Sequence, residues 1–150
     1  MIIVDVNLLL YAVISGFPQH RKARAWWEET LNSSREVGLP AVAIFGFLRL
    51  STNRRVFTTP LTITEALTYV RNWLAEPNVR FLPGTPRHLD TAFALLETLG
   101  AAGNLTTDAQ LAAFAIEHHA ELYSNDTDFA RFDGLKSVNP LLTVMKGPFT

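Results

Sequence analysis

Short, mostly apolar runs alternate along the chain with longer segments in which apolar residues recur at helical spacing. The first short run is β-branched and suits a strand that is buried on both faces. We expect strands at 2–4, 37–39, 79–82 and 121–124. We expect helices at 8–11, 20–32, 40–50, 62–75, 86–99 and about 106–118. The tail from Val138 has turn chemistry in Asn139 and Pro140 and is assigned to no element. This alternation is typical of βαβ units, so it predicts an α/β fold with a mainly parallel sheet flanked by helices.

Polar residues mark the starts of several predicted helices. Asn7 is a good N-cap for the helix after the first strand, and Thr106 or Thr107 is a good N-cap for the last helix. Thr62, followed by Glu65 three residues later, has the spacing of a capping box. These residues therefore set the expected helix boundaries.

Composition indicates an ordinary globular protein. The 150 residues are 48% hydrophobic and 18% charged, and they contain no repeat or linker, so we expect one domain over 1–150. The lack of cysteine excludes a disulfide scaffold, a thiolate metal site and a cysteine nucleophile. Asp5 and Asn7 interrupt the apolar run near the start, which predicts neither a membrane span nor a signal peptide. The expected location is the cytoplasm.

The overall charge gives no sign of a nucleic-acid partner. Thirteen basic and 14 acidic residues leave a net charge of −1, whereas domains that bind duplexes usually carry a clear basic excess. The basic residues nevertheless gather in two places, which are Arg21, Lys22 and Arg24 and then Arg49, Arg54 and Arg55. Each cluster is either a solvated face or part of a patch that contacts phosphates.

Four aspartates from separate segments are expected at one edge of the predicted sheet. Asp5 directly follows the first strand, and Asp126 and Asp128 come just after the strand that ends near Ser124. Asp108 lies in the first turn of the helix that leads into that strand. In open α/β sheets, ligands bind at the carboxyl ends of the strands. Because clustered carboxylates repel one another unless a cation lies between them, the pattern predicts a Mg²⁺ site, which Mn²⁺ would also suit.

Each aspartate also has a structural explanation. Asp108 could cap its helix and interact with the helix dipole, and Asp126 and Asp128 could be turn or cap residues. Asp5 is harder to explain in this way, because a carboxylate directly after a buried strand is costly unless it is paired or liganded. Asp5 is therefore the strongest single candidate.

Other chemistries find less support in the sequence. Ser124 has no histidine partner in its context, and no glycine-rich phosphate loop occurs. His118 and His119 are adjacent, which does not suit a joint metal site on a helix, where i, i+4 spacing is favoured. A phosphatase of the haloacid-dehalogenase type also places an aspartate after a strand. It needs a second aspartate two residues later, where this chain has Asn7.

Several segments resemble those of a known family. MIIVDVNLLLY (1–11), GNLTTDAQLAA (103–113) and SNDTDFARF (124–132) resemble, in order, the opening, the third acidic and the closing motifs of PIN domains. FLRLSTNRRVF (47–57) is similar to the VapC-type toxins of bacterial toxin–antitoxin pairs, particularly those of mycobacteria. The resemblance covers the chain from Met1 to about Leu141, and its specificity lies in the combined spacing.

The resemblance implies a PIN-like three-layer fold with a mainly parallel central sheet. It also implies a Mg²⁺- or Mn²⁺-dependent endoribonuclease toxin, with transfer or ribosomal RNA as its substrate and a small antitoxin as its inhibitor. Metal-binding and catalytic roles carry over to Asp5, Asp108 and Asp126. Asp128 carries over as a further catalytic acid that lies near the metal or one shell away from it.

The expected reaction is hydrolysis of an RNA phosphodiester bond by a metal-activated water. Asp5 and Asp126 would be inner ligands, and Asp108 would be a ligand or a base that orients the water. Asn7 and Thr127 are expected to support the site by hydrogen bonding.

One position departs from the family pattern. Many PIN domains have a glutamate on the third helix, three residues before an arginine such as Arg49, and this chain has Gly46 there. No acidic residue lies between Glu36 and Glu65 to replace it. The change lowers the negative charge of the site, so it implies weaker metal binding or one ion rather than two. It also leaves open a catalytically weakened module that binds RNA or a protein without turnover.

The aromatic helices suggest where partners bind. The regions around Trp26–Trp27 and Phe45–Phe47 are rich in large apolar residues, and they could form a groove for an amphipathic antitoxin helix. They could also form a self-complementary face of a homodimer. The alternative is that these side chains, like Trp73, pack internally.

Overall fold

The computed structural model describes residues 1–142 and contains a five-stranded sheet. The strands are β1 (Ile2–Val4), β2 (Val37–Pro40), β3 (Val79–Leu82), β4 (Glu121–Tyr123) and β5 (Lys136–Val138). Their order is β3-β2-β1-β4-β5, and every neighbouring pair is parallel. The predicted parallel sheet is therefore confirmed. The sequence pattern predicted no strand at β5, which three residues of largely exposed chain form at the edge of the sheet.

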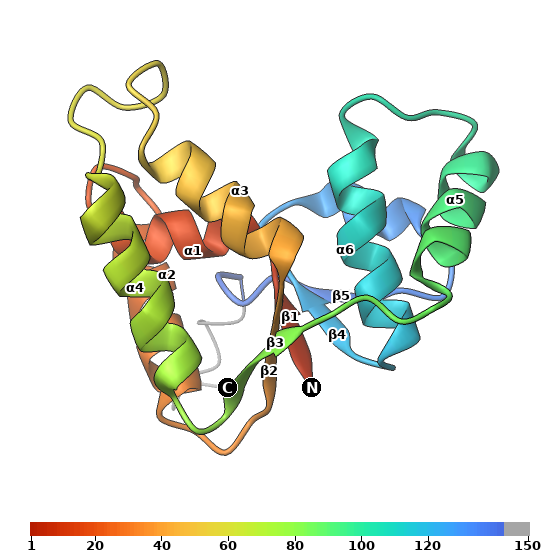
Figure 1. The fold of residues 1–150 in the computed structure, drawn as a ribbon, viewed down its shortest axis with the longest axis horizontal. Coiled ribbons are helices and arrows are strands. Elements are labelled where there is room, and N and C mark those ends of the chain that lie inside the picture. Colours follow the sequence, from red (N-terminus) through yellow and green to blue (C-terminus); the bar gives the residue numbers. More distant parts are fainter. Residues whose placement is uncertain (143–150) are drawn as a thin grey trace.

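Helices cover both faces of this sheet. They are α1 (Val6–Val13), α2 (His20–Leu31), α3 (Ala41–Ser51), α4 (Ile63–Ala75), α5 (His88–Leu99) and α6 (Leu105–Glu117), followed by the short 3-10 helix η1 (Thr127–Arg131). Helices α1 to α4 gather on one side and α5 and α6 on the other, which gives the three layers expected from the resemblance (Figure 1). Across residues 1–142, the helices are too short or too polar to cross a membrane.

The direction in which the chain winds through the sheet reverses between β1 and β4. From β1 the chain winds outward through β2 to β3, and it then returns across β1 to reach β4 and β5. Parallel crossovers are almost always right-handed, so reversing the direction of winding puts the later helices on the opposite face. Ligands of open α/β sheets bind at this kind of switch point, outside the carboxyl ends of the strands.

The helix caps differ in part from the prediction. The Thr62 and Glu65 capping box is present, with both reciprocal hydrogen bonds. Asp5, rather than Asn7, caps α1, because the helix begins at Val6 and Asp5 is the single residue between it and β1. The last long helix begins at Leu105, so Thr106 and Thr107 lie within its first turn and neither caps it.

The aromatic residues predicted to form a partner groove are mostly internal. Trp27 and Phe47 are buried and pack against Trp73, with ring centroids 5.7 and 4.9 Å away. Trp26 stacks on Tyr123 at 5.7 Å and is half-buried. Of the alternatives left open by the sequence, internal packing therefore holds for Trp27 and Phe47, which fill the layer between the helices and the sheet. Among the aromatic residues of that prediction, Phe45 is the exposed one, at 66%.

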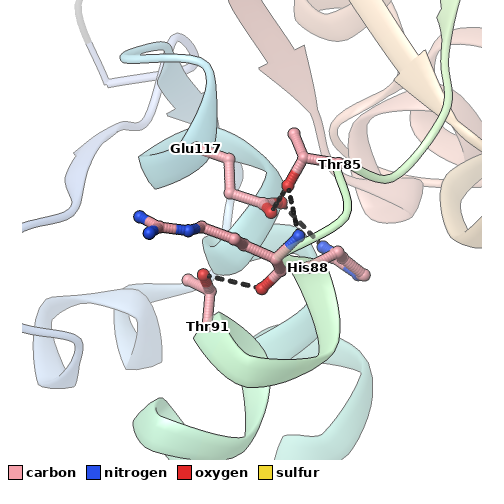
Figure 2. Close-up of polar contacts among 5 residues, drawn as sticks. Thr85, His88, Thr91 and Glu117 are labelled. Atoms are coloured by element: carbon pink, nitrogen blue, oxygen red, sulfur yellow. Dashed lines mark hydrogen bonds and ion pairs between the residues drawn. The ribbon is translucent and has the colours of Figure 1, made fainter.

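A buried polar cluster fastens α6 to the start of α5 (Figure 2). Glu117, in the last turn of α6, pairs with His88 at 2.8 Å between Oε2 and Nδ1, and the Thr85 hydroxyl donates to Oε1. The side chains of His88 and Glu117 are only 14% and 6% exposed. The His88 ring lies 4.1 Å from the Phe114 ring, which closes the apolar side of the cluster. The helix that carries Asp108 is thereby anchored at its opposite end.

We expect Glu117→Ala to lower the free energy of unfolding by about 3 kcal/mol, because it leaves the polar groups of His88 and Thr85 buried without their partner. Urea denaturation followed by circular dichroism measures this loss. Glu97→Ala, on the exposed face of α5, is the matched control and should cost less than about 0.5 kcal/mol. Equal losses in the two variants would show that the cluster does not anchor α6.

Candidate active site

Asp5 occupies the junction between β1 and α1. Its side chain is almost completely buried, at 8% exposure. Oδ1 accepts a hydrogen bond from the Val6 amide at 2.7 Å, and Oδ2 accepts one from the Ser124 hydroxyl at 2.7 Å. Its own amide donates to the Tyr123 carbonyl oxygen at 2.9 Å. Asp5 therefore ties the ends of β1 and β4 together at the switch point.

Ser124 is the centre of a hydrogen-bond network that the sequence did not reveal. Its buried hydroxyl donates to Asp5 and accepts from the Asp126 amide at 2.9 Å and from Asn7 Nδ2 at 3.3 Å. Asn7 Oδ1 also accepts from the Asn125 amide at 3.4 Å, which confirms its predicted supporting role. A serine directly after a strand and two residues before an aspartate was the available signal. Its role here is to orient carboxylates rather than to attack a substrate.

Asp126 and Asp128 lie just after β4, Asp126 at the start of η1 and Asp128 within it. Asp126 caps η1, where its Oδ1 accepts from the Asp128 amide at 2.9 Å. The Asp128 side chain is about half exposed, and its Oδ1 lies 3.9 Å from Arg131 Nη2. Thr127 is exposed, and its side chain makes no hydrogen bond within the described part of the chain, so its predicted supporting role has no structural basis.

The charges of the four aspartates meet at Asp108. Burial raises the pKa of Asp108 to about 6, and the charges of Asp5, Asp126 and Asp128 contribute to the rise. Burial also raises the pKa of Asp5, against the opposing hydrogen bonds from Ser124 and Val6, and the charge of Asp126 raises it further. Asp5, Asp126 and Asp128 therefore lie close enough for their charges to act on Asp108.

The chemistry of these residues fits a hard divalent cation. The ligand atoms available are all carboxylate oxygens, which is the set that Mg²⁺ and Mn²⁺ prefer. Within residues 1–142, no three acidic or histidine side chains are already placed to hold an ion together. Each Asp5 oxygen has accepted one hydrogen bond and keeps a further lone pair, so the existing network leaves it able to bind a cation. The uncompensated negative charge is the feature that a cation would satisfy.

Gly46 lies beside Asp5, where α3 passes over the start of α1. A Cβ at this position would come within 2.8 Å of Val6 Cγ2, so a larger residue needs Val6 to move. Gly46 and Asp5 both line a hollow of about 800 Å³. Where many PIN domains have a glutamate side chain, this chain therefore has close packing against Val6 and, next to it, the open hollow.

The sequence matches the PIN domain family over residues 2–135. This chain belongs to the PIN domain family. It is 58% identical over 141 residues to Ribonuclease VapC33 of Mycobacterium tuberculosis, covering 94% of this chain and 99% of that protein. It is therefore a PIN-domain protein of the VapC ribonuclease family, and the phosphatase alternative is excluded.

Solved structures share the same fold. Mycobacterium tuberculosis VapC20, described as a toxin that cleaves the Sarcin-Ricin loop, aligns with a TM-score of 0.68 at 19% identity. That alignment covers 91% of this chain and 99% of VapC20. A toxin–antitoxin complex from Klebsiella pneumoniae aligns with a TM-score of 0.60 at 19% identity, covering 93% and 98% of the two chains. At this identity the likeness establishes the fold.

The raised pKa of Asp108 makes the stability of the metal-free protein depend on pH. Its folded pKa, about 6, lies above the ordinary value of 3.8, so the folded state holds this proton more tightly than the unfolded state does. The contribution of Asp108 to stability is therefore lost as the pH rises from about 4 through about 6. We expect Asp108→Asn to raise the melting temperature in EDTA, by an amount that grows across this range and is constant above it.

Thermal unfolding of the wild type and the variant at several pH values measures this difference. Glu97→Gln, which neutralises an exposed acid on α5, is the control and should show no such growth. A difference that stays constant from pH 4 to pH 7 would contradict the electrostatic description of the site.

Proposed function

We propose that this chain is a metal-dependent endoribonuclease that acts as the toxin of a toxin–antitoxin pair. The observation that carries the proposal is the grouping of four aspartates near the switch point of the sheet. Burial, together with the charges of Asp5, Asp126 and Asp128, raises the pKa of Asp108. The 58% identity to a ribonuclease over nearly the whole chain supports the same reaction. The proposed location is the cytoplasm, where its RNA substrates are made and used.

In the proposed mechanism, Asp5, Asp108 and Asp126 hold the divalent cation, with Asp128 as a further acid at the rim of the site. The bound cation supplies positive charge for the phosphoryl oxygens and lowers the pKa of a water molecule. Ser124 keeps the Asp5 carboxylate oriented, because it donates to one of its two oxygens at 2.7 Å. Burial and the neighbouring charges raise the pKa of Asp108 to about 6, so its carboxylate would be suited to accept a proton from the attacking water.

The proposed substrate is a single-stranded segment of transfer or ribosomal RNA. Sequence-selective RNA recognition mostly targets single-stranded loops, whose bases are free to be contacted. VapC20, a fold neighbour, is a toxin described as cleaving one RNA loop, the Sarcin-Ricin loop. The proposed protein partner is a small antitoxin encoded beside this chain, and the toxin–antitoxin complex among the fold neighbours supports it.

A second candidate function is a PIN-like module that binds RNA or a protein without turnover. Two observations favour it: Gly46 replaces a carboxylate, and within residues 1–142 no three acids are already arranged around an ion position. Calorimetric titration with Mn²⁺ separates the two functions. Saturable binding below millimolar metal that is lost in Asp5→Asn favours the nuclease, and no binding favours the module.

We expect the protein to cleave transfer or ribosomal RNA in Mg²⁺ or Mn²⁺ and to lose this activity in EDTA. Asp5→Asn should lower the rate by more than about 100-fold, since even outer-shell changes at metal sites cost about 10- to 100-fold. Asparagine is also a good N-cap, so this variant removes the charge while keeping the start of α1. Asp90→Asn, an exposed acid on α5, should cleave at the wild-type rate. Cleavage that survives both EDTA and Asp5→Asn would refute the proposal.

We also propose a homodimer, in which the α5 side of the molecule forms the interface. Leu89 and Phe93 lie one turn apart on the same face of α5 and are 63% and 54% exposed. Large apolar side chains gathered at the surface mark interaction sites.

We expect the double variant Leu89→Glu, Phe93→Glu to be monomeric, because it places two like charges on each side of a self-complementary interface. Sedimentation velocity of the wild type and the variant checks this. The control is Tyr69→Glu, an exposed aromatic residue on α4, which should leave the dimer intact. A dimer that persists in the double variant would place the interface elsewhere.

A further inference from the structure

An open hollow extends from the aspartate site along α3. It has a volume of about 800 Å³, and Asp5 and Thr107 are among the residues that line it. Gly46 forms part of its wall, and the exposed side chains of Phe45 and Ile63, 66% and 55% exposed, form its apolar lining. Large apolar side chains that are exposed together, with polar residues around them, mark ligand-binding grooves and interaction sites.

A second hollow, of about 650 Å³, continues from the first toward the loop between α3 and α4. The two hollows share Thr52 and Ile63 in their linings. Helix α3 leads away from the sheet to this loop, which is yellow in Figure 1. The lining of the second hollow includes Arg54 and four threonines, which are Thr52, Thr58, Thr59 and Thr62. We call the two hollows together the α3 trough.

The charge of the α3 trough is positive away from the aspartates. Arg49 lines the first hollow and Arg54 the second, and Arg55 is adjacent in sequence. All three side chains are exposed, and none has a carboxylate partner within residues 1–142. Their segment also lacks acidic residues from Val37 to Thr64. The trough therefore combines an apolar floor near the reaction site with unpaired cations farther out.

We propose that the α3 trough binds the single-stranded RNA that flanks the scissile phosphate. The neighbouring base stacks on Phe45 and contacts Ile63, and the phosphates beyond it lie near Arg49 and Arg54. This inference rests on the proposed nuclease function, and it names the residues that select the nucleotides beside the cut. Gly46 is a determinant of this site, because a longer side chain there would approach both Val6 and the hollow.

Two features favour RNA over a protein segment as the occupant. Single-stranded nucleic-acid sites pair a cationic groove, which follows the backbone, with aromatic side chains on which bases stack. The α3 trough has both a cationic part and an exposed aromatic ring. Asp5, one of the aspartates that would act on the phosphate, also lines it. A protein helix would need a continuous apolar stripe, whereas the outer half of the trough presents Arg54 and threonine hydroxyls.

The test is a binding cycle between one side chain and one base. The probe is a short, fluorescein-labelled, single-stranded RNA of mixed sequence, together with copies that carry an abasic nucleotide at each position in turn. Binding is measured by fluorescence anisotropy in the Asp5→Asn background, which prevents cleavage during the measurement. Phe45→Ala should weaken binding about 5- to 150-fold, as loss of one stacked base does. At one position of the RNA, removing the base should weaken binding to the protein that keeps Phe45 by the same factor as Phe45→Ala does. The same abasic RNA should bind the Phe45→Ala variant no more weakly than the complete RNA does.

The salt dependence tests the cationic half of the trough. Arg54→Gln should reduce the slope of log Kd against log salt concentration by about 0.7, the value for one phosphate contact on a single strand. Arg21→Gln is the control, since Arg21 is an exposed arginine on α2 with no carboxylate partner within the described residues, and it should leave the slope unchanged. Tyr69→Ala is the matched control for Phe45→Ala, because Tyr69 is an exposed aromatic residue outside the trough.

The outcomes separate this inference from the proposed function. Hydrolysis of bis(p-nitrophenyl) phosphate needs the aspartate site but no flanking base, so Phe45→Ala should retain the wild-type rate on it. If the wild type cleaves RNA while Phe45→Ala binds RNA like Tyr69→Ala, the trough inference is wrong and the nuclease stands. If no substrate is cleaved but the coupling to one base is found, the trough stands and the nuclease fails. A Phe45→Ala protein that keeps RNA binding but escapes its antitoxin would make the trough a protein-binding surface and overturn the inference.

Discussion

The burial of one carboxylate at the end of the central strand is the constraint on which the rest of the site depends. Asp5 follows three apolar residues of β1 and is itself almost completely buried, so its charge has to be satisfied by the protein. The amide of Val6 and the hydroxyl of Ser124 each donate to one of its oxygens. Because one donor begins α1 and the other ends β4, satisfying this carboxylate also joins the two halves of the sheet at the switch point.

These hydrogen bonds only partly offset the cost of burial, since the pKa of Asp5 is still raised. Asp108 adds a further charge on α6, and its pKa of about 6 reflects burial and the three other aspartates. The pair of Glu117 and His88 holds α6 from its far end, so Asp108 cannot simply move away from this repulsion without moving the helix. The PIN-domain chain thus maintains a concentration of negative charge that its own residues do not neutralise, which is the property a cation site requires.

Gly46 links the charge of the site to the shape beside it. A side chain at this position would approach Val6, directly after Asp5, so the helix and the strand end pack closely there. The same glycine leaves the wall of the α3 trough open between the aspartates and the exposed ring of Phe45. One small residue therefore reduces the number of carboxylates and enlarges the space next to those that remain. In the proposed ribonuclease, both effects act on the same stretch of RNA.

The sequence by itself determined the parallel α/β fold and the meeting of the four aspartates, because strand and helix periodicities are local and parallel strands end at one edge. It did not reveal β5, whose three residues are largely exposed and pair only through their backbone. Local patterns also could not show that Trp27 and Phe47 pack inward, or that Ser124 lies between Asp5 and the Asp126 amide. Those contacts join residues far apart in the chain, and only the packing of the layers decides them. Asp5 shows most clearly the difference between what is local and what is tertiary. Its importance follows from its place after a buried strand, whereas its hydrogen-bond partner Ser124, more than a hundred residues away, is set by the tertiary structure alone.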